Sequence, residues 1–228
     1  MAVEDMANVI GAAYDAEVRG RGLRTEFDEA TRSHILEAAR WLCDPDGRPG
    51  LLLTGSYGNG KSTLMSAICT AVNFLFDHAS SDRRHTIRTV EAAHIARLGC
   101  NEAREQWFRD LCNEEMLAVE ELGEEPAEII RYGMPYRPVR DFILERYKRQ
   151  KLTVYCTNLI ETDTVKHITE HYGPRVADRM REMMHVIPFL NESYRGRAVR
   201  IGAPRRPEEG TRGEGNATEN EKTRINAL

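Results

Sequence analysis

One stretch of eight residues constrains the fold of this chain more than any other. It reads Gly55-Ser56-Tyr57-Gly58-Asn59-Gly60-Lys61-Ser62 and matches the pattern G-x-x-x-x-G-K-[ST] in full. The apolar run 51–54 before it has the length of a buried strand, and the pattern over residues 61–77 after it predicts a helix. Glycines there let successive backbone N–H groups point at one phosphate, at a helix N-terminus whose dipole favours anions. The sequence therefore predicts a phosphate-binding loop, and an ordinary glycine-rich turn is the weaker explanation.

This loop motif assigns chemistry to particular side chains. Lys61 would reach the β- and γ-phosphates of a nucleotide, and the Ser62 hydroxyl would coordinate Mg²⁺. The chain has no N-K-x-D guanine-recognition motif after a later strand, which favours ATP over GTP. The residues of this segment predicted to hold the nucleotide are Gly55, Ser56, Tyr57, Gly58, Asn59, Gly60, Lys61, Ser62 and Thr63.

Apolar runs typical of strands alternate with helical patterns along the middle of the chain. The predicted strands are 51–54, 86–90, 116–120, 152–156 and 185–189, and the predicted helices are 61–77, 91–112, one within 126–149, and 161–182. Such alternation predicts a parallel sheet covered by helices on both faces. The fold class expected is thus an α/β P-loop NTPase, a three-layer α/β/α arrangement with a five-stranded parallel sheet.

Both ends of the chain differ from this middle part. Two amphipathic helical patterns lie within residues 1–46 and predict a short helical N-terminal extension. Residues 204–228 are rich in Pro, Glu, Gly, Arg, Asn and Thr and predict a disordered tail, because they can bury little apolar surface. The predicted ATPase core is 47–203.

Composition excludes several classes of protein. The 228 residues are 41% hydrophobic and 30% charged, with no apolar run long enough for a membrane span and an acidic N-terminus unlike a signal peptide. A net charge of −4 excludes a polycation that coats nucleic acid, although local basic patches can still bind phosphates. The five scattered cysteines argue against a zinc site or a disulfide framework. We expect a soluble, cytoplasmic protein.

Two acids end the third predicted strand, at Glu120 and Glu121. In a P-loop enzyme this position carries a metal-supporting carboxylate and a carboxylate that orients water. Glu120 would then hold Mg²⁺, directly or through water, and Glu121 would polarise the attacking water. The alternative is that acids simply follow a strand into a solvated loop. Glu124 and Glu125 are interpreted as charges at the N-terminus of a helix that starts at Pro126.

Thr157 and Asn158 end the fourth predicted strand. A polar amide at the carboxyl end of a strand beside the P-loop strand can hydrogen-bond a γ-phosphate or its water. A turn-forming Asn explains the same position equally well.

Five motifs in this order resemble those of the AAA+ ATPases, most closely their bacterial helicase-loader (DnaC-like) and transposition-helper (IstB-like) branch. The resemblance covers about residues 25 to 200. The motifs are Gly55 to Ser62, Glu120-Glu121-Leu122-Gly123, Thr157-Asn158, Gly173 to Met180, and Glu192 to Gly196.

The resemblance implies roles for an asparagine and three arginines. Asn158 would be the sensor-1 residue, and Arg179 the arginine finger that contacts the γ-phosphate of a neighbouring subunit. Arg175 competes with Arg179 for that role, and Arg195 would be a second arginine sensor. Two features depart from the family pattern. Glu120 stands where the family usually has Asp, and the chain lacks residues for a full C-terminal helical lid.

The function implied is an ATP-driven assembly factor with Mg-ATP bound between subunits of a homo-oligomer. It would hydrolyse ATP slowly and act on DNA with a partner protein, either a replicative helicase docked on residues 1 to about 43, or a transposase. Two other interpretations stay open: a small-molecule P-loop kinase, and a nucleotide-gated interaction module with little turnover. The basic residues considered for DNA contact are Arg83, Arg84, Arg137 and Arg140.

Overall fold

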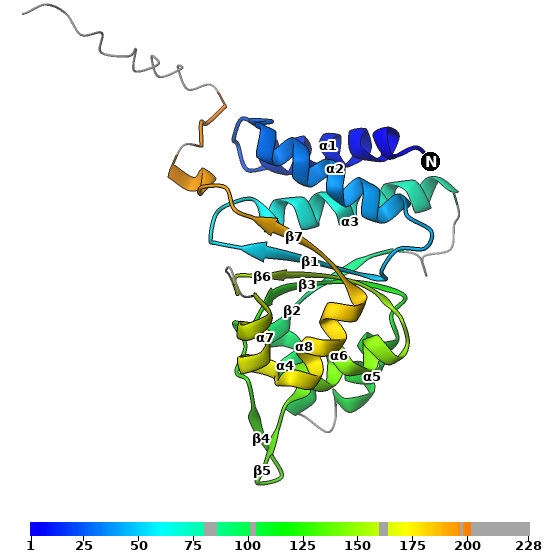
Figure 1. The fold of residues 1–228 in the computed structure, drawn as a ribbon, viewed down its shortest axis with the longest axis vertical. Coiled ribbons are helices and arrows are strands. Elements are labelled where there is room, and N and C mark those ends of the chain that lie inside the picture. The colour runs from blue at the N-terminus through cyan, green and yellow to red at the C-terminus, as the bar shows by residue number, and fades with distance from the viewer. Residues whose placement is uncertain (80–85, 101–103, 160–163, 197, 202–228) are drawn as a thin grey trace, which may run out of the picture.

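The computed structural model describes residues 1–79, 86–100, 104–159, 164–196 and 198–201. The predicted tail 204–228 and the arginines Arg83 and Arg84 lie outside these described residues. Within them the chain forms a parallel sheet with helices on both faces (Figure 1). The predicted three-layer α/β/α class is confirmed.

Five strands pair in the order β2-β3-β6-β1-β7, and every pair in this sheet is parallel. The strands are β1 (Gly50–Gly55), β2 (Arg88–Glu91), β3 (Met116–Leu122), β6 (Leu152–Thr157) and β7 (Met184–Phe189). All six residues of β1 are buried, as are the first four of β3. Because all strands are parallel, the glycine-rich loop, the paired acids and Asn158 follow strand ends at the same edge of the sheet.

One face of the sheet is covered by three helices: α1 (Val3–Gly20), α2 (Glu29–Cys43) and α3 (Lys61–Ala79) (Figure 1). The apolar side of α1, with Met6, Ile10 and Tyr14, is buried in one cluster with residues of α3 such as Met65 and Ile68. The Asp28 carboxylate caps α2 by accepting the Thr31 backbone N–H at 2.9 Å. The inner faces of both N-terminal helices therefore belong to the core, so a partner could contact only their outer faces.

The opposite face carries α4 (Ala92–Cys100), α5 (Glu105–Asn113), α6 (Pro138–Lys148), α7 (Thr164–Tyr172) and α8 (Pro174–Met183) (Figure 1). A second core cluster there joins β3 and β6 to α6 and α8, through residues such as Val119, Tyr155, Phe142 and Met180.

Three expected helices differ from the structure. The pattern over 91–112 is divided into α4 and α5, with 101–103 outside the described residues. The pattern over 161–182 is broken between α7 and α8, because Gly173 has a φ of 89° and Pro174 begins a new helix. The helix expected after Pro126 begins only at Pro138.

A β-hairpin lies between Pro126 and the start of α6. Its strands β4 (Ile129–Arg131) and β5 (Met134–Tyr136) are antiparallel and project from the body of the molecule (Figure 1). Tyr132 and Gly133 connect them with φ values of 53° and 75°, which is the backbone of a tight hairpin turn. The interpretation of Glu124 and Glu125 as helix N-terminal charges was therefore wrong.

None of the helices in the described part of the chain is long and apolar enough to cross a membrane.

Candidate nucleotide-binding site

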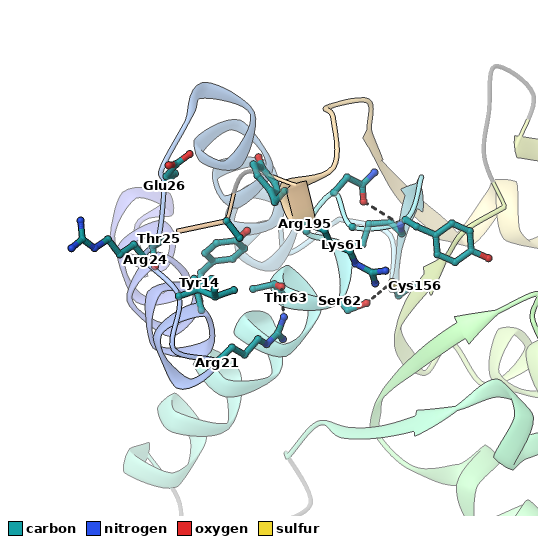
Figure 2. Close-up of a pocket in the computed structure, with 18 of the residues that line it drawn as sticks. Tyr14, Arg21, Arg24, Thr25, Glu26, Lys61, Ser62, Thr63, Cys156 and Arg195 are labelled. Atoms are coloured by element: carbon teal, nitrogen blue, oxygen red, sulfur yellow. Dashed lines mark hydrogen bonds between the residues drawn. The ribbon is translucent and has the colours of Figure 1, made fainter. Parts of the chain in front are cut away.

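A cavity of about 450 Å³ lies at the carboxyl edge of the sheet (Figure 2). This volume is within the range of about 300 to 1,000 Å³ typical of small-molecule sites. Its walls are the loop between β1 and α3, the connection between α1 and α2, and the C-terminal segment around Arg195. The predicted site residues that line it are Tyr57, Gly58, Asn59, Gly60, Lys61, Ser62, Thr63, Glu121, Asn158 and Arg195.

The glycines of the loop are required by its backbone and by its neighbours. Gly58 has a φ of 80°, and a Cβ there would lie 2.3 Å from the Ser193 hydroxyl oxygen. Gly55 has a φ of 150°, and its Cβ would lie 2.5 Å from the carbonyl oxygen of Phe189. Any side chain at either position would clash, so the loop can curl tightly only with glycine.

The Lys61 ammonium is buried inside this loop, with the residue only 4% exposed. Its Nζ donates to the carbonyl oxygens of Gly55 at 2.7 Å and Ser56 at 2.6 Å, and to Oδ1 of Asn59 at 3.2 Å. Burial lowers the pKa of Lys61, and the nearby positive charge of Arg195 lowers it further. The loop thus surrounds one cation with neutral oxygens beside an open cavity.

The paired acids lie in different surroundings. Glu121 lines the cavity, and it sits at an irregularity of β3 between Val119 and Leu122 with a φ of 55°. Glu120 does not line this cavity but an adjacent hollow, together with Glu91. Burial raises the pKa of Glu120, and the charges of Glu121 and Glu91 add to this effect. The structure therefore brings Glu121 to the loop and places Glu120 in a second hollow.

Asn158 lies at the cavity with a partner that the sequence did not indicate. Its Nδ2 donates to Oε1 of Glu124 at 3.4 Å, and the Tyr57 hydroxyl donates to the same oxygen at 2.8 Å. Glu124 therefore links the glycine-rich loop to the end of β6.

Glu125 is a buried carboxylate, 3% exposed, between the loop after β3 and helix α7. It accepts the Gly123 backbone N–H at 2.9 Å and the Tyr172 hydroxyl, and Nε2 of His171 lies 3.6 Å away. Burial alone would raise the pKa of Glu125, but the contacts with His171, Tyr172 and the backbone hold it below its ordinary value. Glu125 therefore ties the loop that follows Glu121 to α7.

The three predicted arginines separate into two groups. Arg195 lines the cavity, whereas Arg175 and Arg179 lie on α8 and do not. Arg179 donates to Oε2 of Glu182 at 3.0 Å and to the Tyr147 hydroxyl at 3.2 Å, and Arg175 is exposed at the start of the helix. Neither α8 arginine completes the site of its own subunit.

The connection between α1 and α2 forms a wall that sequence reasoning missed. Arg21 lines the cavity and donates to the Thr63 hydroxyl at 3.1 Å (Figure 2). The backbone of Arg24 donates to the Val199 carbonyl at 2.8 Å, and Leu23 pairs with Arg200 in an isolated bridge. The basic cluster Arg19, Arg21 and Arg24 is visible in the sequence, but nothing in its spacing places it beside a loop about forty residues later.

Comparison with known proteins gives a consistent result at the level of fold. No protein-family model and no curated protein sequence matches the chain. Among solved structures, the DnaC helicase loader matches with a TM-score of 0.53 and 18% identity, over 72% of this chain and 93% of that one. DnaI matches with a TM-score of 0.54 and 19% identity, over 75% and 87% of the two chains. A provisionally assigned primosome component from Streptococcus pyogenes serotype M3 has a TM-score of 0.54 and 14% identity, over 80% and 97%.

The fold, with its glycine-rich loop between β1 and α3, is that of a P-loop NTPase. It is similar to the folds of the solved DnaC helicase loader and DnaI, as the sequence motifs had indicated.

Proposed function

We propose that this chain is an ATP-binding and ATP-hydrolysing AAA+ assembly factor that acts on DNA together with a partner protein. The observation that carries the proposal is a single cavity lined by Lys61, Ser62, Glu121, Asn158 and Arg195. The sequence positions of these residues span about 140 residues, so only the fold gathers them.

Phosphate binding would use the loop and its lysine. The oxygens of a triphosphate would compete for Nζ of Lys61 with the carbonyl groups of Gly55 and Ser56, which now accept its hydrogen bonds. A charged phosphate oxygen is a stronger acceptor for an ammonium than a neutral carbonyl. The loop carbonyl groups therefore hold Lys61 at the edge of the cavity.

The oxygen donors suit Mg²⁺. The Ser62 hydroxyl lines the cavity and would coordinate the ion, since hard oxygen ligands are those that Mg²⁺ prefers. Glu120, which lines the second hollow, would hold the ion directly or through water. When bound, Mg²⁺ supplies positive charge that neutralises the phosphate oxygens.

Hydrolysis would use Glu121 and Asn158. Glu121 would accept a proton from the attacking water, and the Asn158 amide would orient that water or the γ-phosphate, after leaving Glu124. Arg195 would add a second positive charge from within the same subunit.

A complete site would need a second copy of the chain. Arg179 or Arg175 of a neighbouring subunit would provide the arginine finger, and Arg179 would first have to leave Glu182 and Tyr147. The fold of the solved helicase loaders favours a replicative helicase over a transposase as the partner protein. Arg137 and Arg140 remain DNA candidates, although each already pairs with an acid, Glu128 and Asp141.

Mixing two inactive variants tests the proposal. The Glu121→Gln protein cannot activate water in its own site, but its Arg179 can still reach the site of a neighbouring subunit. The Arg179→Ala protein keeps Glu121 but cannot supply the arginine to its neighbour. We expect each alone to be slow and the mixture to recover turnover, in an ATPase assay over a protein concentration series with and without DNA. An arginine supplied in trans is worth about 10³ to 10⁵ in rate. Fast turnover by highly diluted monomer would contradict the proposal, and recovery with Arg175→Ala instead would identify the other arginine.

A further inference from the structure

The 3₁₀ turn Tyr194–Gly196, which carries Arg195, has no buried residue. The turn is therefore not part of the core, and polar contacts contribute to its position. Its backbone provides one of them, since the Tyr194 N–H donates to the carbonyl oxygen of Gly58 at 2.8 Å. The chain on either side is held as well, since Nδ2 of Asn191 donates to the Asn59 carbonyl at 3.1 Å and the Val199 carbonyl accepts the Arg24 N–H at 2.8 Å.

The Tyr194 side chain supplies a second attachment on the opposite side. Its hydroxyl donates to the Asp28 carboxylate, with both carboxylate oxygens 3.0 Å away, and lies 2.9 Å from the hydroxyl oxygen of Thr31. Thr31 is 3% exposed, and the Asp28 carboxylate also caps α2. The hydroxyl is thus attached to the rigid start of a core helix through a charge-assisted hydrogen bond.

These two attachments place Arg195 beside the phosphate-binding loop. A Cβ on Gly58 would lie 3.0 Å from Cγ and 3.1 Å from Cδ of Arg195, so the arginine stem runs directly over that glycine. A Cβ on Gly60 would lie 3.3 Å from the Tyr194 ring. Figure 2 shows Arg195 at the cavity, which it reaches from the C-terminal segment.

We propose that Tyr194, held by Asp28, is a positioning residue that fixes Arg195 over the bound phosphates, so that helix α2 forms part of the nucleotide site. This inference rests on the proposed function, because it requires that the cavity bind ATP. The Tyr194 ring lines the cavity beside Gly60, but its hydroxyl points to α2 and would act on the nucleotide through Arg195.

A double-mutant cycle tests this, with Mg-ATP affinity measured by calorimetry for the full chain and for Tyr194→Phe, Arg195→Ala and the double variant. Tyr194→Phe keeps the ring and removes only the hydroxyl. We expect it to weaken binding by roughly 5- to 10-fold, and Arg195→Ala by roughly 10- to 100-fold, as for hydrogen bonds to charged groups. The double variant should bind Mg-ATP with the same affinity as Arg195→Ala, because the Tyr194 hydroxyl has no effect on binding once Arg195 is absent.

Independent losses that multiply in the double variant, or full affinity in Tyr194→Phe, would overturn the proposal. A purely structural role of the hydroxyl would weaken binding equally in both backgrounds, so the cycle separates the two roles. The matched control is Glu37→Gln, which removes the negative charge from the 3.1 Å contact between α2 and His185, at the start of β7. It should leave ATP affinity unchanged.

Lys61→Ala distinguishes failure of this inference from failure of the proposed function. If Lys61→Ala and Arg195→Ala weaken binding and Tyr194→Phe does not, only the positioning role is wrong. If the parent chain binds no Mg-ATP, the proposed function is wrong as well.

Discussion

A buried cation lies at each of the two edges of the sheet where the strands begin and end, and the two cations have different surroundings. At the amino edge, Arg146 is completely buried and donates to the Thr153 hydroxyl at 2.7 Å and to the carbonyl oxygens of Glu114 at 2.8 Å and Leu152 at 2.7 Å. At the carboxyl edge, Lys61 is equally surrounded by neutral oxygens, but its loop borders a cavity.

This difference suggests that Arg146 serves the stability of the fold, whereas Lys61 serves the binding of a ligand. The acceptors of Arg146 come from the end of α5, the residue that follows it and the start of β6, which are fixed parts of the core. The acceptors of Lys61 are carbonyl groups of the loop, and phosphate oxygens can replace them as acceptors of its hydrogen bonds. In open parallel sheets, ligands bind outside the carboxyl ends of the strands. We therefore expect variants at the carboxyl edge to change function, and variants at the amino edge to change stability.

The largest effect is expected for Glu121→Gln at the carboxyl edge. Removal of the proposed water-activating carboxylate should lower the ATP turnover rate by about 10²- to 10⁴-fold and leave ATP binding intact. Glu115→Gln, just before the same strand at the amino edge, is the matched control in the ATPase assay. Equal turnover in Glu121→Gln and the parent would show that the catalytic assignment is wrong.

Arg146→Ala should have the largest effect at the amino edge. It leaves a cavity and several buried carbonyl groups without donors, so the free energy of unfolding in urea should fall by about 4 kcal/mol. The ATP affinity of the folded fraction should not change. Arg149→Ala, exposed on the same helix end, should lower the free energy of unfolding by less than about 0.5 kcal/mol. If Arg146→Ala and Arg149→Ala both lowered the free energy of unfolding by a similarly small amount, the stabilising role assigned to the amino edge would be wrong.

Glu125→Gln should have an intermediate effect with a defined pH dependence. The folded chain lowers the pKa of Glu125, so its contribution to stability is present above the ordinary carboxyl pKa and is lost as the pH falls through the folded pKa. Near neutral pH the variant should be about 2 kcal/mol less stable, because its amide cannot accept the same bonds. In urea titrations at decreasing pH, the free energies of unfolding of the parent and the variant should become equal in the acidic range. A difference that stays constant with pH would show that the charge of Glu125 is not its cause.

Glu120→Gln should have the smallest effect and the opposite sign. Folding raises the pKa of Glu120, so the charged carboxylate costs stability once the pH rises above its ordinary pKa. The variant should therefore melt roughly 1 to 2 °C higher than the parent near neutral pH. Below the ordinary carboxyl pKa the two melting temperatures should coincide. A lower melting temperature at neutral pH would mean that Glu120 already has a stabilising partner.

The sequence predicted those features whose signals are local. The glycine-rich loop, its strand and its helix are contiguous, and all five strands of the sheet were expected near their observed positions. Two boundaries were missed although turn signals were present, at Gly173-Pro174 and at Tyr132-Gly133. In both places the helical periodicity outweighed a dipeptide that interrupts helices.

Features that depend on distant partners could not be predicted. Glu125 contacts Tyr172, which lies 47 positions later in the chain, and the Asp28–Tyr194 contact joins residues 166 positions apart. The separation of Glu120 and Glu121 into two hollows was not predicted, and the register of β3 shifts between Val119 and Leu122, which no local pattern indicates.

Calorimetric titration of Mg-ATP into the parent chain and into Lys61→Ala tests the central claim most directly. We expect saturable one-to-one binding to the parent, and binding weaker by on the order of 100-fold in the variant, which loses a charged hydrogen-bond donor. Equal affinity in the two proteins, or no heat of binding in the parent, would contradict a nucleotide site at the carboxyl edge of this sheet.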